Sequence, residues 1–476
     1  MVQAGYVTDV VYGSAYTPSQ APIQLACAAM AAGVRAPDPR DAFNYLELCC
    51  GNGLTLCVLA ACYPHARFHG VDFNGVHIAM ARELAQRGGL DNVSFEHADL
   101  VDAHAIAARS LEFISVVGAF SWLDDARQQA VFARAASGLR EDGLLHIHYA
   151  SLPGAAQSDA LHNALCLIAP AKGQSDHRLK AALATMADLV GTEAKFFSDN
   201  PVAARRLREA MANPAADEAH EIFSRGAGPR WFAQMYEMAA ARGLTPVAEA
   251  DTQAPIWAAD TQAAEAIRNQ TLRDIQLNRS ARQDVYARAG VALAPQPSAF
   301  LESLRWYAHP RCRTQPTAYA ARLSLSPSDA ALFFSALAAG HGAREVECAL
   351  GRPSAPVFLA AAHQGFIRPL VARTPVPAHP DPRLSAFNAY ALELGLRQNS
   401  SIPLAATAVG TQIVLPLVDR LRLFVVCGGA TDALLGPLDA SSRALYEEAL
   451  SESALAAFRD SALPELHQLG VLEVLG

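Results

Sequence analysis

The sequence predicts an α/β fold in which a parallel, doubly wound sheet carries helices on both faces. Short apolar runs at residues 43–48, 67–71 and 93–97 end next to small or acidic residues, as buried strands do. Stretches with helical spacing at 54–62 and 75–87 separate these runs. Strands that alternate with such helices need crossover connections, which make neighbouring strands parallel. Because these crossovers are right-handed, the carboxyl ends of the strands meet at one edge, where ligands bind.

The same alternation continues as far as residue 249. Further strands are predicted at 113–117, 144–149 and 244–249, with helices at 128–139 and 230–242. Residues 155–228 have a helical pattern rich in alanine and charge, and they lie between two strands of one sheet. We therefore interpret this stretch as a helical insertion.

The length of 476 residues predicts about three domains at roughly 150 residues each. We expect an N-terminal lid segment at 1–40, the sheet domain at 41–255 with its insertion at about 155–228, a middle region at 256–329 and a mixed α+β C-terminal domain at 330–476. The stretch 293–298, which contains proline, indicates a boundary, and so do the polar loops at 311–316 and 324–329. In the C-terminal domain, 412–417 and 421–426 predict short strands.

Composition and charge narrow the class of protein. Hydrophobic residues make up 51% of the chain and charged residues 18%, which is enough apolar material for a core. The net charge of −8 argues against a dedicated nucleic-acid binder. We also see no signal peptide, no apolar stretch long enough to insert into a membrane and no CxxC pair for zinc. We expect a reduced, cytoplasmic protein without a bound metal.

A glycine-containing loop follows the first strand and opens a helix. Its glycines, Gly51 and Gly53, let the backbone turn sharply and let a ligand approach the amides. The free N–H groups at the start of the helix favour an anionic group. A nicotinamide dinucleotide needs a third glycine for close packing of helix and strand, but Leu56 occupies that position. The loop therefore argues against a dinucleotide.

The loop resembles the first motif of class I S-adenosylmethionine-dependent methyltransferases, (Asp/Glu)-x-Gly-x-Gly-x-Gly. Glu47, Gly51 and Gly53 match the motif, and Cys49 stands at its first glycine. The resemblance implies that S-adenosylmethionine is the cofactor and that these residues bind it. Two further strand ends fit the same pattern. Asp72 would accept both ribose hydroxyls, and Asp99 with Leu100 would contact the adenine.

Flanking segments are similar to bacterial methyltransferases that carry a regulatory domain, a family that includes protein-lysine methyltransferases acting on outer-membrane proteins in rickettsiae. The matching segments are Tyr-Val-Thr-Asp-Val-Val-Tyr at 6–12, Asp-Phe-Asn at 72–74 with His77, Gly-Ala-Phe-Ser-Trp at 118–122 and Tyr-Ala-Ser-Leu-Pro-Gly at 149–154. The resemblance implies a Rossmann-like seven-stranded sheet, a regulatory role for the middle region and a lysine on a protein as methyl acceptor. It also adds cofactor contacts at Tyr12, Phe73, His77 and Gly118.

The candidate catalytic residues are aromatic. Phe120 and Trp122 predict an apolar acceptor pocket, which favours the neutral form of an amine whose reference pKa is near 10.4. Tyr16, with Tyr12, would close over the cofactor, and Tyr149 would orient the amine. Phe120 and Trp122 are alternatively core aromatics beneath the sheet edge.

Other interpretations stay open at this point. A histidine pair at 146 and 148 suits a metal or a base, but buried, hydrogen-bonded histidines explain it more simply because no third ligand is evident. The acceptor is either a protein, including an outer-membrane or surface protein, or a small molecule in a closed pocket. A non-catalytic interaction protein on a degenerate fold is the third alternative, and a homodimer is one possible state.

Overall fold

The computed structural model describes the whole chain except residues 1, 4–5, 14, 104–106, 214, 225, 251–261, 292–302, 372–381, 399, 401, 430–445 and 474–476. Its centre is a seven-stranded sheet in the order β5-β4-β3-β6-β7-β9-β8. The strands are β3 (Asn44–Leu48), β4 (Arg67–Asp72), β5 (Val93–His97), β6 (Leu111–Val116), β7 (Leu139–Ala150), β8 (Leu244–Glu249) and β9 (Ala281–Arg288). All neighbours pair in parallel except β9, which is antiparallel to β7 and β8. The predicted α/β class is confirmed.

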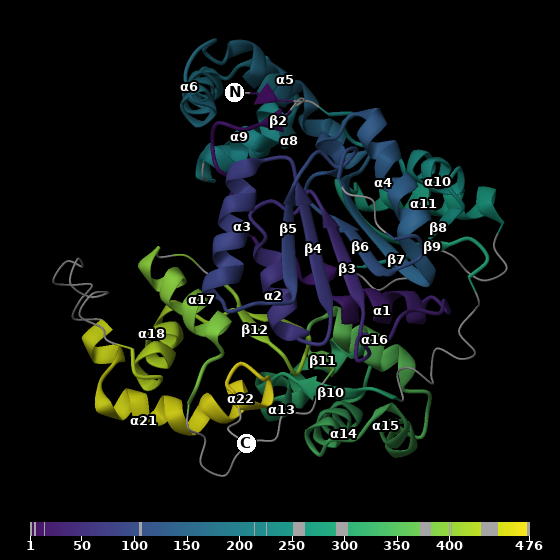
Figure 1. The fold of residues 1–476 in the computed structure, drawn as a ribbon, viewed down its shortest axis with the longest axis vertical. Coiled ribbons are helices and arrows are strands. Elements are labelled where there is room, and N and C mark those ends of the chain that lie inside the picture. The colour runs from purple at the N-terminus through teal and green to yellow at the C-terminus, as the bar shows by residue number, and fades with distance from the viewer. Residues whose placement is uncertain are drawn as a thin grey trace.

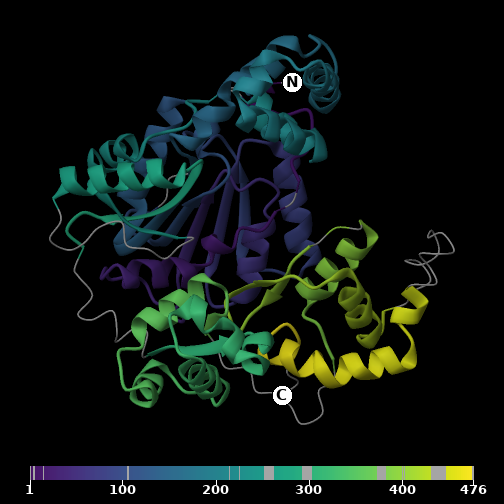
Figure 2. The same cartoon turned by 180° about the vertical axis from the view of Figure 1, so that it is seen from behind.

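Helices cover both faces of the sheet (Figures 1 and 2). Successive side chains of a strand point to opposite faces, so β3 contributes to two cores. Tyr45 packs into the core that also contains residues of α1 and α2, whereas Leu46 and Leu48 pack into the core that contains residues of α4 and α10. The helices beside the sheet are α1 (Pro22–Ala31), α2 (Leu54–Cys62), α3 (Gly75–Arg87), α4 (Asp125–Gly138), α10 (Phe232–Ala240) and α11 (Ala263–Leu277).

The insertion predicted at 155–228 forms a helical cap with its own apolar core. Its elements are η3 (Gly154–Ser158), α5 (Asp159–Ile168), α6 (Ser175–Gly191), α7 (Lys195–Asp199), α8 (Pro201–Ala212) and α9 (Ala215–Phe223). Leu161, Leu179 and Ile222 belong to the core of this cap, and so does Val7 of strand β2 (Tyr6–Val7), which pairs with β1 (Val2–Gln3). The N-terminal segment is thus packed against the insertion, above the sheet edge in Figure 1.

The C-terminal part mixes helices with two small antiparallel sheets. Its strands are β10 (Arg305–Ala308) with β11 (Ile367–Leu370), and β12 (Leu404–Ala406) with β13 (Thr411–Ile413). Its helices are α13 (Pro310–Thr314), η4 (Pro316–Tyr319), η5 (Ala321–Leu323), α14 (Pro327–Ala338), α15 (Ala343–Leu350), α16 (Ala355–His363), α17 (Ala386–Arg397), α18 (Leu417–Val426), α21 (Glu452–Ser461) and α22 (Leu463–Gln468). One apolar core joins this part to helices α1 and α2, which pack against the seven-stranded sheet.

The sheet extends past the boundary expected at residue 255, because β9 is inserted between β7 and β8. The boundary itself and the stretch 293–298 lie outside the described residues. The expected boundary at 329/330 falls inside α14, and strands β10 and β11 pair across it.

Two C-terminal predictions also need correction. Residues 421–426 were expected to form a strand but belong to helix α18, since an apolar run of this length also fits a buried helix. Of 412–417, only the first two residues lie in β13, and Pro416 precedes α18.

Candidate active site

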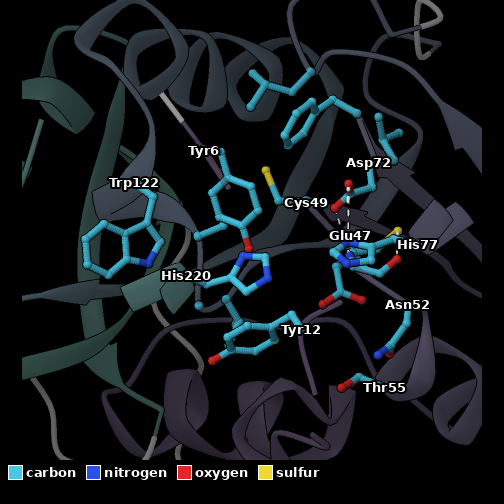
Figure 3. A pocket seen from close by; sticks show the side chains of 18 of the residues that line it. Tyr6, Tyr12, Glu47, Cys49, Asn52, Thr55, Asp72, His77, Trp122 and His220 are labelled. Atoms are coloured by element: carbon cyan, nitrogen blue, oxygen red, sulfur yellow. Dashed lines mark hydrogen bonds and ion pairs between the residues drawn. The ribbon is translucent and has the colours of Figure 1, made fainter. Parts of the chain in front are cut away.

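A cavity of about 290 Å³ lies at the carboxyl edge of the sheet (Figure 3). Loops after β3, β4, β5 and β6 form its floor, as expected for a doubly wound sheet. The N-terminal segment and helix α9 also contribute residues to it. In the view of Figure 3, Tyr6, Tyr12 and His220 are grouped beside Glu47, Asp72 and His77.

The loop after β3 has three residues in the left-handed backbone region. Gly51 has φ 53° and Gly53 has φ 72°. A Cβ on Gly53 would lie 2.6 Å from Ala81 Cβ and 2.7 Å from the Phe95 ring, so a side chain has no room there. Cys49 also has a positive φ of 60°, which explains why the motif carries glycine at its position. Holding an ordinary residue in this region costs about 1–2 kcal/mol.

Asp72 holds the loop from the neighbouring strand. Its Oδ2 accepts a hydrogen bond from the Gly51 N–H at 2.9 Å, and its Oδ1 accepts one from the Asn74 N–H at 2.8 Å. Asn74 in turn caps α3, because its side chain accepts from the Val76 and His77 N–H groups. Burial raises the pKa of Asp72, and the two N–H donors oppose that rise. A carboxylate offers about four acceptor positions, so Asp72 still has capacity for ribose hydroxyls.

Glu47 places an unpaired oxygen at the cavity. Its Oε1 accepts from Gln20 Nε2 at 2.6 Å, whereas its Oε2 is buried and has no hydrogen-bond partner among the described residues. Burial raises the pKa of Glu47 to about 8. A buried carboxylate oxygen without a partner suits an ammonium group, such as that of the methionyl part of S-adenosylmethionine. Together with Asp72 and the start of α2, this oxygen makes the residues present fit that cofactor.

Asp99 and Leu100, for which the sequence resemblance implies an adenine contact, both line the cavity, and Asp99 is paired with Arg127. Arg127 Nε donates to Asp99 Oδ1 at 3.2 Å and to Oδ2 at 3.0 Å, and Arg127 Nη2 donates to Oδ2 at 2.5 Å. Partial burial alone would raise the pKa of Asp99, but the hydrogen bonds from Arg127 lower it below its ordinary value. Leu100 is 4% exposed and offers an apolar surface suited to a flat ring. The ion pair between Asp99 and Arg127 therefore holds this part of the cavity lining in place, and Leu100 supplies the apolar surface that a flat ring would contact.

Most of the predicted binding residues meet in this cavity, and several predicted catalytic residues do not. The lining includes Tyr12, Glu47, Cys49, Gly51, Asp72, Phe73, His77, Asp99, Leu100, Gly118 and Trp122. Gly53, the remaining predicted binding residue, caps the start of α2 and is not among the residues that line the cavity. Trp122 is thus a cavity residue, whereas Phe120, its neighbour in η2 (Phe120–Trp122), is fully buried against the rings of Phe132 and Tyr149.

Tyr149 was predicted to orient the acceptor amine and Tyr16 to close over the cofactor, but neither side chain lines the cavity. Tyr149 is buried and donates its hydroxyl hydrogen to Asp284 Oδ2 at 2.7 Å. The Tyr16 hydroxyl forms a 2.7 Å hydrogen bond with Thr411 Oγ1 of β13. Phe120, Tyr149 and Tyr16 therefore support the fold around the site. Phe120 packs against other buried rings, and the hydroxyl groups of Tyr149 and Tyr16 are hydrogen-bonded to residues that are distant in sequence.

Among the charged, histidine and tyrosine side chains that line the cavity, four had been assigned no role from the sequence: Tyr6, Arg127, His220 and Glu221. His220 and Glu221 belong to α9 of the insertion, where no motif marks them. Tyr6 lies in a matching segment but was assigned no role. The suggested histidine pair separates: His148 lines the cavity, whereas His146 is fully buried, and burial lowers its pKa to about 3.

Comparisons with known proteins agree with this geometry. Residues 46–143 match the family model for a methyltransferase domain. An uncharacterized protein of Synechocystis sp. is 27% identical over 304 residues, which are 61% of this chain and 60% of that protein. An uncharacterized protein of Rickettsia prowazekii is 31% identical over 133 residues, 28% of this chain and 24% of that protein. The chain thus spans less than two thirds of the length of these relatives.

A solved structure shares the whole architecture. PKMT2 from Rickettsia typhi, in complex with AdoHcy, matches 97% of this chain and 99% of its own with a TM-score of 0.69 at 12% identity. No helix in the described part of this chain combines the length and apolar character that a membrane span needs. The chain has a Rossmann-like class I methyltransferase fold. Its residues 46–143 form a methyltransferase domain, and the cofactor of this domain is S-adenosylmethionine.

Proposed function

We propose that this chain methylates the side-chain amine of lysine residues in a protein. The observation that carries the proposal is the acidic lining of the cavity. Four acidic side chains contribute to it, those of Glu47, Asp72, Asp99 and Glu221, and a cation bound beside them favours their ionised form. Arg127 is the single lysine or arginine among the described lining residues, and it is paired with Asp99. Such a cavity favours cationic ligands, and both the cofactor and a lysine ammonium are cationic.

The mechanism rests on positioning. When bound, S-adenosylmethionine supplies an electrophilic methyl group on a positively charged sulfur. Glu47 would hold its ammonium, and Asp72 its ribose. The side chains of Val71, Leu100 and Leu123 line the cavity with apolar surface, which disfavours the protonated amine and favours its nucleophilic neutral form. Alignment of the amine with the methyl group then supplies most of the acceleration, since this transfer needs little covalent help.

The protein acceptor rests on two supports. The sequence resembles rickettsial-type protein-lysine methyltransferases, and the fold of PKMT2 from Rickettsia typhi matches 97% of this chain. In addition, two segments distant in sequence, the N-terminal segment and the insertion, contribute residues to the cavity, and both are available to contact a polypeptide acceptor. An outer-membrane or surface protein as acceptor follows from the sequence resemblance alone.

Two experiments test these steps separately. For the cofactor, Asp72→Ala should abolish calorimetric binding of AdoHcy while circular dichroism stays unchanged, and the exposed Asp91→Ala serves as the matched control. Unchanged AdoHcy affinity in Asp72→Ala would refute the ribose contact. For the acceptor, the protein is incubated with methyl-labelled cofactor and a bacterial lysate. Label at lysine residues of polypeptides supports the proposal, and label found only on metabolites shows a small-molecule methyltransferase instead.

A further inference from the structure

Helix α9 forms one wall of the cavity and is fastened to the N-terminal segment. His220 Nε2 lies 3.0 Å from the carbonyl oxygen of Val10, and the Tyr12 hydroxyl donates to Glu221 Oε1 at 3.3 Å. Both His220 and Glu221 line the cavity. The insertion therefore supplies polar side chains to the site itself, besides covering it.

The hydrogen bond to Val10 determines which nitrogen of His220 carries the hydrogen. A carbonyl oxygen only accepts, so Nε2 is the donor and Nδ1 of the neutral ring keeps a lone pair. His220 is 1% exposed, and its Nδ1 has no hydrogen-bond partner among the described residues. Burial lowers the pKa of His220, which keeps the ring neutral. A buried acceptor atom at a cavity wall is thus left for an N–H donor that the described residues do not supply.

Glu221 adds a carboxylate beside that acceptor. Burial, together with the nearby Glu218, raises the pKa of Glu221 to about 7. The basic side chain near these two acids is Arg206, which pairs with Glu218 at 2.6 Å. Within the described part of the chain, no salt bridge joins Glu221 to a cation. A carboxyl group that titrates near neutral pH is well matched to proton transfer.

Two aromatic rings flank the same place. The centroid of the His220 ring lies 5.1 Å from that of Tyr6 and 5.2 Å from that of Tyr12. Faces of tyrosine rings attract cations, and the attraction persists when the nitrogen gains methyl groups. An ammonium group would therefore meet a carboxylate, a nitrogen lone pair and two rings on this wall.

We propose that His220 and Glu221 bind the acceptor amine, with Glu221 as the group that receives its proton. The inference rests on the proposed function and locates its acceptor site on α9, away from the buried Phe120. An N–H bond of the ammonium breaks, its electron pair stays on nitrogen, and the proton forms an O–H bond on the Glu221 carboxylate. A remaining N–H group donates to His220 Nδ1, which orients the nitrogen lone pair toward the methyl group.

The test uses the full chain saturated with AdoHcy and Nα-acetyl-lysine amide as the probe, with affinity measured by calorimetry. Glu221→Gln keeps an oxygen for the Tyr12 hydroxyl but removes the charge. His220→Gln keeps a donor for Val10 but removes the Nδ1 lone pair. We expect each variant to weaken probe binding at least tenfold while AdoHcy affinity changes less than twofold. Glu209→Gln, on an exposed part of α8, is the matched control and should bind the probe like the unaltered chain.

A second readout follows the proton. The methylation rate of the unaltered chain should rise with pH through about 7, as Glu221 ionises, and this rise should be lost in Glu221→Gln. Nitrogen chemical shifts of His220 should show hydrogen on Nε2, and its Nδ1 signal should move when the probe binds.

The outcomes separate this inference from the proposed function. Unchanged probe affinity in Glu221→Gln and His220→Gln would overturn the acceptor site, even if the unaltered chain binds AdoHcy and methylates lysine. A parallel loss of AdoHcy affinity would also overturn it, since the wall would then hold the cofactor. Failure of the unaltered chain to bind AdoHcy would instead contradict the proposed function.

Discussion

The two glycines of the cofactor loop should respond differently to alanine, because only one of them is packed. In Gly53→Ala the new Cβ would lie 2.6 Å from Ala81 Cβ and 2.7 Å from the Phe95 ring, far inside the usual carbon contact of about 3.5–4.0 Å. Overpacking of this kind costs about 1–3 kcal/mol. The left-handed backbone at φ 72° adds about 1–2 kcal/mol. We therefore expect Gly53→Ala to lower the free energy of unfolding by about 2–5 kcal/mol.

Gly51→Ala isolates the backbone contribution. Gly51 has φ 53°, and a Cβ there meets no atom within 4 Å, so only the left-handed strain of about 1–2 kcal/mol applies. The unfolding entropy of about 2.1 cal/mol/K per residue corresponds to roughly 1 °C per kcal/mol for a chain of this length, so the midpoint should fall by about 1–2 °C for Gly51→Ala and by about 2–5 °C for Gly53→Ala. Thermal unfolding of both variants without ligand, followed by circular dichroism, measures the difference. Equal losses, or a larger loss for Gly51→Ala, would refute the packing argument.

Three further predictions concern neighbouring parts of the structure. Cys49→Gly should relieve left-handed strain at φ 60° and raise the free energy of unfolding by up to about 1 kcal/mol, measured by urea unfolding, and a clear loss would contradict this. Tyr16→Phe should cost about 1 kcal/mol through the lost bond to Thr411 but leave AdoHcy affinity within twofold by calorimetry, whereas a tenfold weaker affinity would return Tyr16 to the site. The pKa of Glu47 is raised from 4.5 to about 8 by burial, so the folded state binds the extra proton between these values. Stability should therefore decline as pH rises through that window, by at most about 1.4 kcal/mol per pH unit. Glu47→Gln should flatten the decline, and an unchanged slope in urea unfolding at several pH values would show another group responsible.

The sheet was predictable where local patterns are strong. Six of its strands were expected from apolar runs, and β9 was not, because its sequence carries charges. Arg282 and Asp284 of β9 are fully buried, a position that sequence patterns assign to apolar residues. Their burial is possible because Arg282 pairs with Asp284 at 3.1 Å, with Asp274 at 2.7 Å and with Glu249 at 3.4 Å. Removing one partner from such a network typically costs about 3–5 kcal/mol.

The order of the strands was enough to predict that Glu47, the glycine loop and Asp72 meet at one cavity. Glu47, the glycine loop and Asp72 each stand at or just after the end of a strand, and parallel strands bring such ends together whatever the remaining packing. The acceptor side lacked this advantage. Phe120 and Tyr149 were plausible acceptor residues by type and position, as Tyr16 was for a lid over the cofactor. The direction of a side chain and its partners, however, depend on segments far away in sequence.

The order of local elements thus determined by itself that a ligand site lies at the sheet edge, since that edge follows from chain direction and right-handed crossovers. The resemblance of the glycine loop to a methyltransferase motif added S-adenosylmethionine as the expected cofactor. Only the tertiary structure decided which groups line the opposite side of the cavity. Helix α9 reaches that position through the packing of the insertion against Val7 and through hydrogen bonds to the N-terminal segment. Contacts between residues so distant in sequence leave no periodic or motif signal, because their geometry arises only when the whole chain is packed.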